Sequence, residues 1–184
     1  MPIGPDDERR TTSSDVGQPP SAVRAQRAAP SEYKRKLPHI QAGGKTQFLT
    51  FVTKRRWTLP GPVRQLVLDA CFHDHGTKYL LHGCVVMPDH VHLVLSPLSD
   101  PNGSVYPLSQ ITNGIKGSSA HAVNKALGRK GPVWQPETFD HLLRTGESAR
   151  SKTEYLCQNP VRAGLVATED EYPWLWREWV EVAT

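Results

Sequence analysis

Two β-rich segments joined by a very short turn constrain the fold of this chain most strongly. Residues 78–87 and residues 90–96 are rich in strand-forming residues, and only Pro88 and Asp89 separate them. A connection of this length that contains turn-forming residues predicts an antiparallel hairpin. The fold must therefore contain a sheet that includes this hairpin.

Further periodic segments lie on both sides of the hairpin. Apolar residues that recur every second position predict strands, and those that recur at three- and four-residue intervals predict helices. We expect a strand over residues 47–53, a helix that begins at Gly61-Pro62 and ends near Gly76, a helix over 108–127, a short strand over 133–139 and a helix over 147–158 that ends before Asn159-Pro160. Gly114 and Gly117 predict a kink or close packing in the second helix.

The resulting order, β-α-β-β-α-β-α, is typical of a ferredoxin-like split βαβ layer. We therefore expect an α+β fold, an antiparallel sheet with helices on one face. Residues 1–32 are rich in Pro, Ser, Thr, Ala and Arg and contain no aromatic residue, which predicts a disordered N-terminal arm. Residues 33–184 then form the domain, with the last tryptophans packed back onto it.

Length and composition exclude several classes of protein. The chain has 184 residues, a length that favours one domain. No apolar run approaches the roughly 18 to 20 residues of a membrane-spanning helix, and no secretory signal precedes the domain. Cys71, Cys84 and Cys157 are too scattered for a disulfide framework, so we expect reduced, buried thiols. These features indicate a cytoplasmic protein without a membrane partner.

The basic residues gather in two segments that contain no acidic residue, residues 33–56 and residues 104–135. Charge runs are most often solvated faces, but with a net charge of +4 these two segments also fit a surface that binds nucleic acid. The residues that we expect to contact phosphates are Lys34, Arg35, Lys36, Lys54, Arg55, Arg56, Lys116, Arg129 and Lys130.

His90 and His92 are the sharpest local feature of the sequence. Side chains two residues apart on a strand lie on the same face, so both imidazoles can approach one cation. Such a pair occurs by chance in a chain with eight histidines. The alternation with Val91, Leu93 and Leu95 strengthens the metal interpretation, because it separates the two histidines from an apolar stripe on the other face.

Two sequence motifs resemble a known family of DNA-cleaving enzymes. The segment Met-Pro-Asp-His-Val-His at 87–92 is similar to the histidine motif of the HUH single-tyrosine transposases, and residues 155–166, YLCQNPVRAGLV, resemble their tyrosine segment. The second motif, with Val133-Trp134-Gln135 and Asp140-His141, is similar to the REP-associated tyrosine transposases. These enzymes are related to small insertion-sequence transposases and act on palindromic repeats. The resemblance covers roughly residues 47–172.

The resemblance implies that His90 and His92 bind a divalent metal and that Tyr155 is the nucleophile. A phenol, with a pKa near 10, is a poor nucleophile at neutral pH, and a metal that polarises the phosphate compensates for this. Asn159 lies four residues after Tyr155 and is the expected third ligand; the alternative is that it is an ordinary residue at the end of a helix. Mn²⁺ is favoured by affinity and Mg²⁺ by abundance.

The implied reaction is metal-dependent cleavage of single-stranded or hairpin DNA through a 5′-phosphotyrosine intermediate, and the sequence leaves open whether the enzyme only cuts or also rejoins the strands. Two alternatives remain open: a domesticated protein that binds hairpins without cutting them, and a phosphodiesterase in which the metal activates water and Tyr155 is dispensable. The sequence leaves open whether the protein acts as a monomer or as a homodimer. Such an enzyme would work in the cytoplasm, on the nucleoid.

Overall fold

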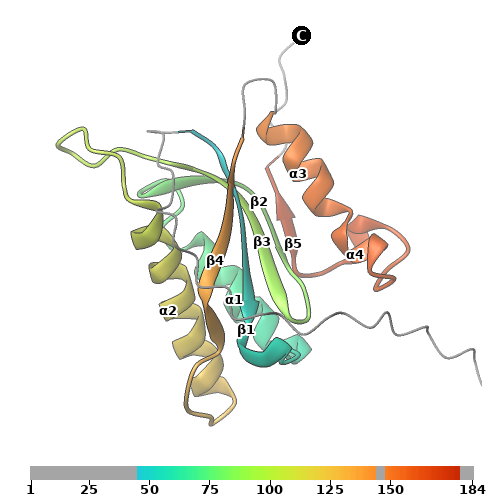
Figure 1. Cartoon of the computed structure of the whole chain (residues 1–184). Helices are drawn as coiled ribbons and strands as arrows, with labels where there is room; N and C mark the ends of the chain where they lie inside the picture. The colour runs from blue at the N-terminus through green and yellow to red at the C-terminus, as the bar shows by residue number, and fades with distance from the viewer. Residues whose placement is uncertain (1–44, 144–147, 179–184) are drawn as a thin grey trace, which may run out of the picture. The chain divides into compact units, whose positions relative to one another are not determined.

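The computed structural model describes residues 45–143 and 148–178. These residues form a five-stranded antiparallel sheet in the order β4-β1-β3-β2-β5 (Figure 1). The strands are β1 (Gln47–Thr53), β2 (Tyr79–Val86), β3 (His90–Pro97), β4 (Trp134–Leu142) and β5 (Leu175–Arg177). The helices are α1 (Gly61–Phe72), α2 (Leu108–Ala126), α3 (Ala149–Cys157) and α4 (Asn159–Arg162), with the short 3-10 helices η1 (Lys54–Arg56) and η2 (Glu169–Glu171). The predicted disordered arm, residues 1–32, lies outside the described residues.

The sheet contains two interleaved split βαβ units. β1 and β2 run in the same direction with β3 between them, and α1 connects them. In the same way β3 and β4 lie on either side of β1, and α2 connects them. The hairpin predicted at Pro88-Asp89 is present, with Val86 opposite Val91. The predicted ferredoxin-like antiparallel layer is therefore confirmed.

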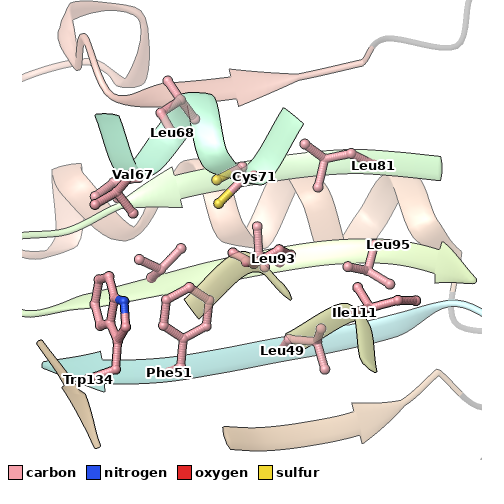
Figure 2. Packing of buried hydrophobic residues seen from close by; sticks show 14 of the residues in the cluster. Leu49, Phe51, Val67, Leu68, Cys71, Leu81, Leu93, Leu95, Ile111 and Trp134 are labelled. Carbon is pink, nitrogen blue, oxygen red and sulfur yellow. The ribbon is translucent and has the colours of Figure 1, made fainter. Parts of the chain in front are cut away.

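α1 and α2 cover one face of the sheet. Leu49, Phe51, Leu93 and Leu95 point from β1 and β3 into the core on this face (Figure 2), where they are fully buried together with residues of both helices. Ile111 of α2 closes the same cluster. This arrangement matches the expectation of helices on one face, since the apolar stripe of β3 lies against them.

α3 differs from that expectation because it covers the opposite face (Figure 1). The physical reason is that β2 and β3 carry apolar side chains on both faces: Val85 and Val94 form a second buried cluster with Leu156 of α3. Gly83 lets α3 come close to β2. A Cβ atom at this position would lie 2.6 Å from Cγ2 of Thr153.

Three local features complete the fold. α2 is one continuous helix through Gly114 and Gly117, so the expected kink is absent, and a Cβ atom at Gly117 would meet nothing within 4 Å, so close packing is absent at that position as well. Pro136 is accommodated because β4 is an edge strand of the described sheet. The three cysteines are free and buried, as predicted. No helix within residues 45–143 and 148–178 has the length and apolar character needed to cross a membrane.

Candidate active site

His90 and His92 lie side by side near the start of β3, on the face of the sheet that α3 covers. Their ring centroids are 4.7 Å apart. His92 lies directly opposite Thr50 of β1, and on its other side opposite Val85 of β2. The strand geometry that the sequence predicted thus brings both imidazoles to one place.

The Nδ1 atom of each imidazole is held by a neighbouring oxygen. Oδ1 of Asp89 lies 2.6 Å from Nδ1 of His90, and Oγ1 of Thr50 lies 2.7 Å from Nδ1 of His92. Asp89 in turn accepts a hydrogen bond from Arg56 at 3.1 Å. With Nδ1 of each ring engaged by an oxygen, Nε2 is the nitrogen that each ring can offer to a cation in the tautomer that carries its proton on Nδ1.

The protonation state of His92 suits metal binding. Burial lowers the pKa of His92 to about 3, and the neighbouring His90 and Arg162 act in the same direction. The imidazole therefore stays neutral at physiological pH and keeps a lone pair. Asp89 stays ionised, since its hydrogen bond with His90 lowers the pKa of its carboxyl group.

Tyr155 extends from α3 over the same face of the sheet. Its side chain is 57% exposed, whereas Thr153, Leu156 and Cys157 form the buried side of the helix. The ring of Phe48 lies 6.4 Å from the Tyr155 ring and 5.4 Å from the His92 ring, measured between centroids. Phe48 thus connects the tyrosine to the histidines, and Tyr155 is not an ordinary core tyrosine.

Asn159 begins a new helix instead of continuing α3. α3 ends at Cys157, and α4 begins at Asn159, with Pro160 in its first turn. Nδ2 of Asn159 donates to the carbonyl oxygen of Leu156, and its Oδ1 accepts a hydrogen bond from Arg162 at 2.8 Å. The oxygen expected to bind a metal is therefore in contact with a guanidinium group.

Arg162 joins α4 to the tyrosine. Its Nη2 atom also donates to the backbone oxygen of Tyr155 at 2.8 Å, and its central carbon lies 4.2 Å from the centroid of the Tyr155 ring. Sequence reasoning gave Arg162 no site role. The cation-π contact could not be read from the seven-residue spacing alone.

Part of the predicted basic surface lies next to the histidine pair. Lys54, Arg55 and Arg56 form η1 at the end of β1 and are exposed, and Arg56 contacts Asp89. Arg55 and Arg56 have φ angles of 55° and 57°, a strained conformation for residues other than glycine. The central guanidinium carbon of Arg129 lies 4.1 Å from the centroid of the Trp57 ring. The segment that follows α2 therefore contacts the residue that follows η1.

The other predicted basic residues differ in their surroundings. Lys130 is exposed beside Arg129. Nζ of Lys116 donates to the backbone oxygen of Pro136 at 2.8 Å and lies 3.3 Å from Oγ1 of Thr138, and burial lowers its pKa. Lys116 thus connects α2 to β4 through these hydrogen bonds. Lys34, Arg35 and Lys36 lie outside the described residues.

Comparison with known proteins gives consistent matches. The chain is 27% identical over 145 residues to the REP-associated tyrosine transposase of Escherichia coli, a match that covers 78% of this chain and 80% of that protein. A solved structure of a REP-associated tyrosine transposase bound to a REP hairpin has a TM-score of 0.56 with this chain and 25% sequence identity, and the match covers 79% and 82% of the two chains. The chain is similar to the REP-associated tyrosine transposases in sequence and in fold. No protein-family model matches it.

A second relative among the REP-associated tyrosine transposases matches a shorter segment. Over 94 residues the chain is 28% identical to the protein of Haemophilus influenzae, which corresponds to 48% of this chain. The match spans 53%, about half, of that relative's length.

The sequence does not reveal the residues that surround and orient the two histidines and Tyr155. Thr50 and Phe48 reach the site only through the register of β1 against β3, which places Thr50 opposite His92 and Phe48 opposite Val94. Asp89 belongs to the predicted turn and to the histidine motif, but the sequence assigns no supporting role to its carboxylate. Its position directly before His90 was the one signal in the sequence that could have assigned it a role.

Proposed function

We propose that this protein cleaves single-stranded DNA at hairpin-forming palindromic repeats and transfers the cut strand, with Tyr155 as the nucleophile. The observation that carries the proposal is the shared face of the sheet: Phe48 connects Tyr155 to His92, with centroid distances of 6.4 Å and 5.4 Å. The relationship to the REP-associated tyrosine transposases supports it. The protein would work on chromosomal DNA, in the cytoplasm.

His90 and His92 fit a divalent cation, Mg²⁺ or Mn²⁺. Both Nδ1 atoms are engaged by oxygens, which leaves the Nε2 lone pairs for a metal, and His92 is neutral. Asn159 is the proposed third ligand: its Oδ1 accepts the hydrogen bond from Arg162 with one lone pair and keeps a second lone pair for the cation. When bound, the cation would polarise a non-bridging oxygen of the scissile phosphate.

The chemical step uses the phenol of Tyr155. Its oxygen forms a bond to phosphorus while the bond from phosphorus to the 3′ oxygen breaks, giving a 5′-phosphotyrosine and a free 3′-hydroxyl. The phenol loses one proton, and the departing 3′ oxygen gains one. The 57% exposure of Tyr155 leaves room for a DNA strand. A second 3′-hydroxyl reverses the step and joins two strands without ATP.

The described surface offers contacts for both phosphates and bases. Lys54, Arg55 and Arg129 supply positive charge at the end of the sheet where β3 begins, as a hairpin backbone requires. Phe139 of β4 is 57% exposed and lies in one row with Thr50 and His92 across three strands. An unpaired base beside the scissile phosphate can stack on this ring.

A covalent-adduct assay tests the proposal. Purified protein is incubated with labelled hairpin DNA from the repeats that flank its gene, in Mg²⁺ or Mn²⁺, and resolved on a denaturing gel. We expect a metal-dependent adduct that is lost in Tyr155→Phe and in His90→Ala, while hairpin binding by Tyr155→Phe is retained. Binding without an adduct would indicate a non-cleaving hairpin protein. Cleavage that survives Tyr155→Phe would indicate water as the nucleophile.

A mixing experiment tests whether one chain carries a complete site. Tyr155, Phe48 and His92 meet within a single chain, so Tyr155→Phe and His90→Ala proteins should stay inactive when mixed. Recovery of the adduct in the mixture would mean that the tyrosine acts on the histidine pair of another copy.

A further inference from the structure

We propose that the guanidinium of Arg162 binds the phosphate group that Tyr155 attacks, forming a phosphate site beside the histidine pair. This inference rests on the proposed function and adds to it a second group, besides the metal, that holds the reacting phosphate. It assigns Arg162 a catalytic role, since the guanidinium would touch the reacting group.

The contacts of Arg162 fix its position and leave donors unused. Both of its hydrogen bonds to described residues, to the backbone oxygen of Tyr155 and to Oδ1 of Asn159, are made by Nη2 at 2.8 Å. An arginine side chain carries five N–H donors in a planar fork. The N–H groups of Nη1 and Nε are therefore available for the oxygens of a phosphate.

The charge of Arg162 also remains available. Both of its described hydrogen-bond partners are neutral oxygens, a carbonyl and an amide. By contrast Arg56, Arg150 and Arg177 each contact a carboxylate. Among the described arginines around the site, Arg162 is thus positioned by groups that do not neutralise it, as an anion-binding residue requires.

Arg162 borders the same space as the nucleophile and the histidines. Its central carbon lies 4.2 Å from the centroid of the Tyr155 ring, and the Phe48 ring next to Tyr155 lies 5.4 Å from the ring of His92. The side chain is exposed to solvent, so a DNA strand that reaches Tyr155 also reaches the guanidinium.

This position suits the charge that develops during the reaction. When the tyrosine oxygen bonds to phosphorus, negative charge accumulates on the non-bridging oxygens before the 3′ oxygen departs. A fixed guanidinium forms two parallel N–H···O bonds to such a group and stabilises it without gaining or losing a proton. Arg162 would contribute most in the transition state, so its loss should lower the rate of adduct formation more than the affinity for DNA.

The alternative is a purely structural role, in which Arg162 only fastens α4 to the end of α3. The test compares Arg162→Ala and Arg162→Lys with Arg150→Ala, a control that removes an exposed arginine from the start of the tyrosine helix. For each protein the single-turnover rate of adduct formation, the Kd for the hairpin and the melting temperature are measured. Adduct formation by Arg162→Ala is then repeated with added guanidinium or methylguanidinium ion.

We expect Arg162→Ala to form the adduct about 100-fold more slowly, with a hairpin Kd within about threefold of the native value. Added guanidinium should restore at least about a tenth of the lost rate, and Arg162→Lys should recover only part of it, because an ammonium cannot form the two parallel bonds. Arg150→Ala should react like the native protein.

Three results would overturn the inference. An Arg162→Ala protein with the native rate would exclude a role in the reaction. A slow variant that guanidinium fails to rescue, and whose melting temperature falls, would show that Arg162 only holds α4 in place. A native protein that forms no adduct with any hairpin would contradict the proposed function and the inference together, which separates this failure from the first two.

Discussion

Thr50 and His92 face each other across β1 and β3, with Oγ1 of Thr50 2.7 Å from Nδ1 of His92. The contact fixes which nitrogen of the imidazole can point away from the strand. Neighbours of this kind orient metal-binding histidines and strengthen metal binding about 10- to 100-fold.

Thr50→Val, which keeps the shape of the side chain but removes the hydroxyl, should weaken Mn²⁺ binding by about 10-fold or more. Thr50→Ser, which keeps the hydroxyl, should bind Mn²⁺ nearly as well as the native protein. Titration calorimetry or the electron paramagnetic resonance signal of free Mn²⁺ gives both affinities without DNA. Equal affinities in all three proteins would mean that this contact does not support a metal site.

The close approach of α3 to the sheet depends on Gly83. Gly83→Ala places a Cβ atom 2.6 Å from Cγ2 of Thr153, so we expect a loss of about 1 to 3 kcal/mol in the free energy of unfolding. Combining it with Thr153→Ser, which removes that methyl group, should recover much of the loss. Urea denaturation of the two single variants and the double variant measures the coupling. Additive effects would show that the two positions do not meet.

A substitution in the strained backbone of η1 should lower DNA binding without lowering the stability of the fold. Arg55 has a φ of 55°, and glycine adopts this conformation without the penalty of about 1 kcal/mol that other residues incur. Arg55→Gly should therefore not destabilise the protein, and it should lower hairpin affinity and flatten its dependence on salt. The control is Arg150→Ala. An unchanged salt dependence for Arg55→Gly would exclude Arg55 from the DNA-binding surface.

Acid should destabilise the metal-free protein. Burial lowers the pKa of His82 below its ordinary value of 6.5, and that of His92 to about 3. The unfolded chain therefore binds these protons at a higher pH than the folded chain does, so the free energy of unfolding falls as the pH drops from about 6.5 towards about 3. His82→Gln should reduce the slope by up to about one proton. Urea denaturation in a chelator across this range measures it, and a flat profile for the native protein would contradict it.

The segments with a clear period or a short turn could be predicted from the sequence. The strand over Gln47–Thr53 begins and ends where its alternation does, and Pro88-Asp89 forms the predicted turn. β5 (Leu175–Arg177) could not be predicted, because three residues show no period and its pairing with β2 is a long-range contact. The side of the sheet that α3 occupies depends on a second apolar face. The sequence does not indicate this face, because His90 and His92 occupy it at the start of β3 and make it look polar.

Some residues of the candidate site could also be predicted from the sequence, and others could not. His90, His92 and Tyr155 belong to local motifs, and the structure brings the rings of His92 and Tyr155 next to the same Phe48 ring. Thr50 and Phe48 act through the register between strands, and Arg162 acts through the helix break at Gln158, so their roles needed the structure.

Mapping the attachment point of DNA on the protein tests the central claim most directly. The covalent adduct is digested with nuclease and trypsin, and its peptides are sequenced by mass spectrometry. Tyr155 is the only tyrosine in the tryptic peptide covering residues 153–162, and we predict that the nucleotide remnant is attached there through a phosphate. A remnant on another tyrosine, such as Tyr106, or cleaved DNA without any modified peptide, would contradict the assignment of Tyr155 as the nucleophile.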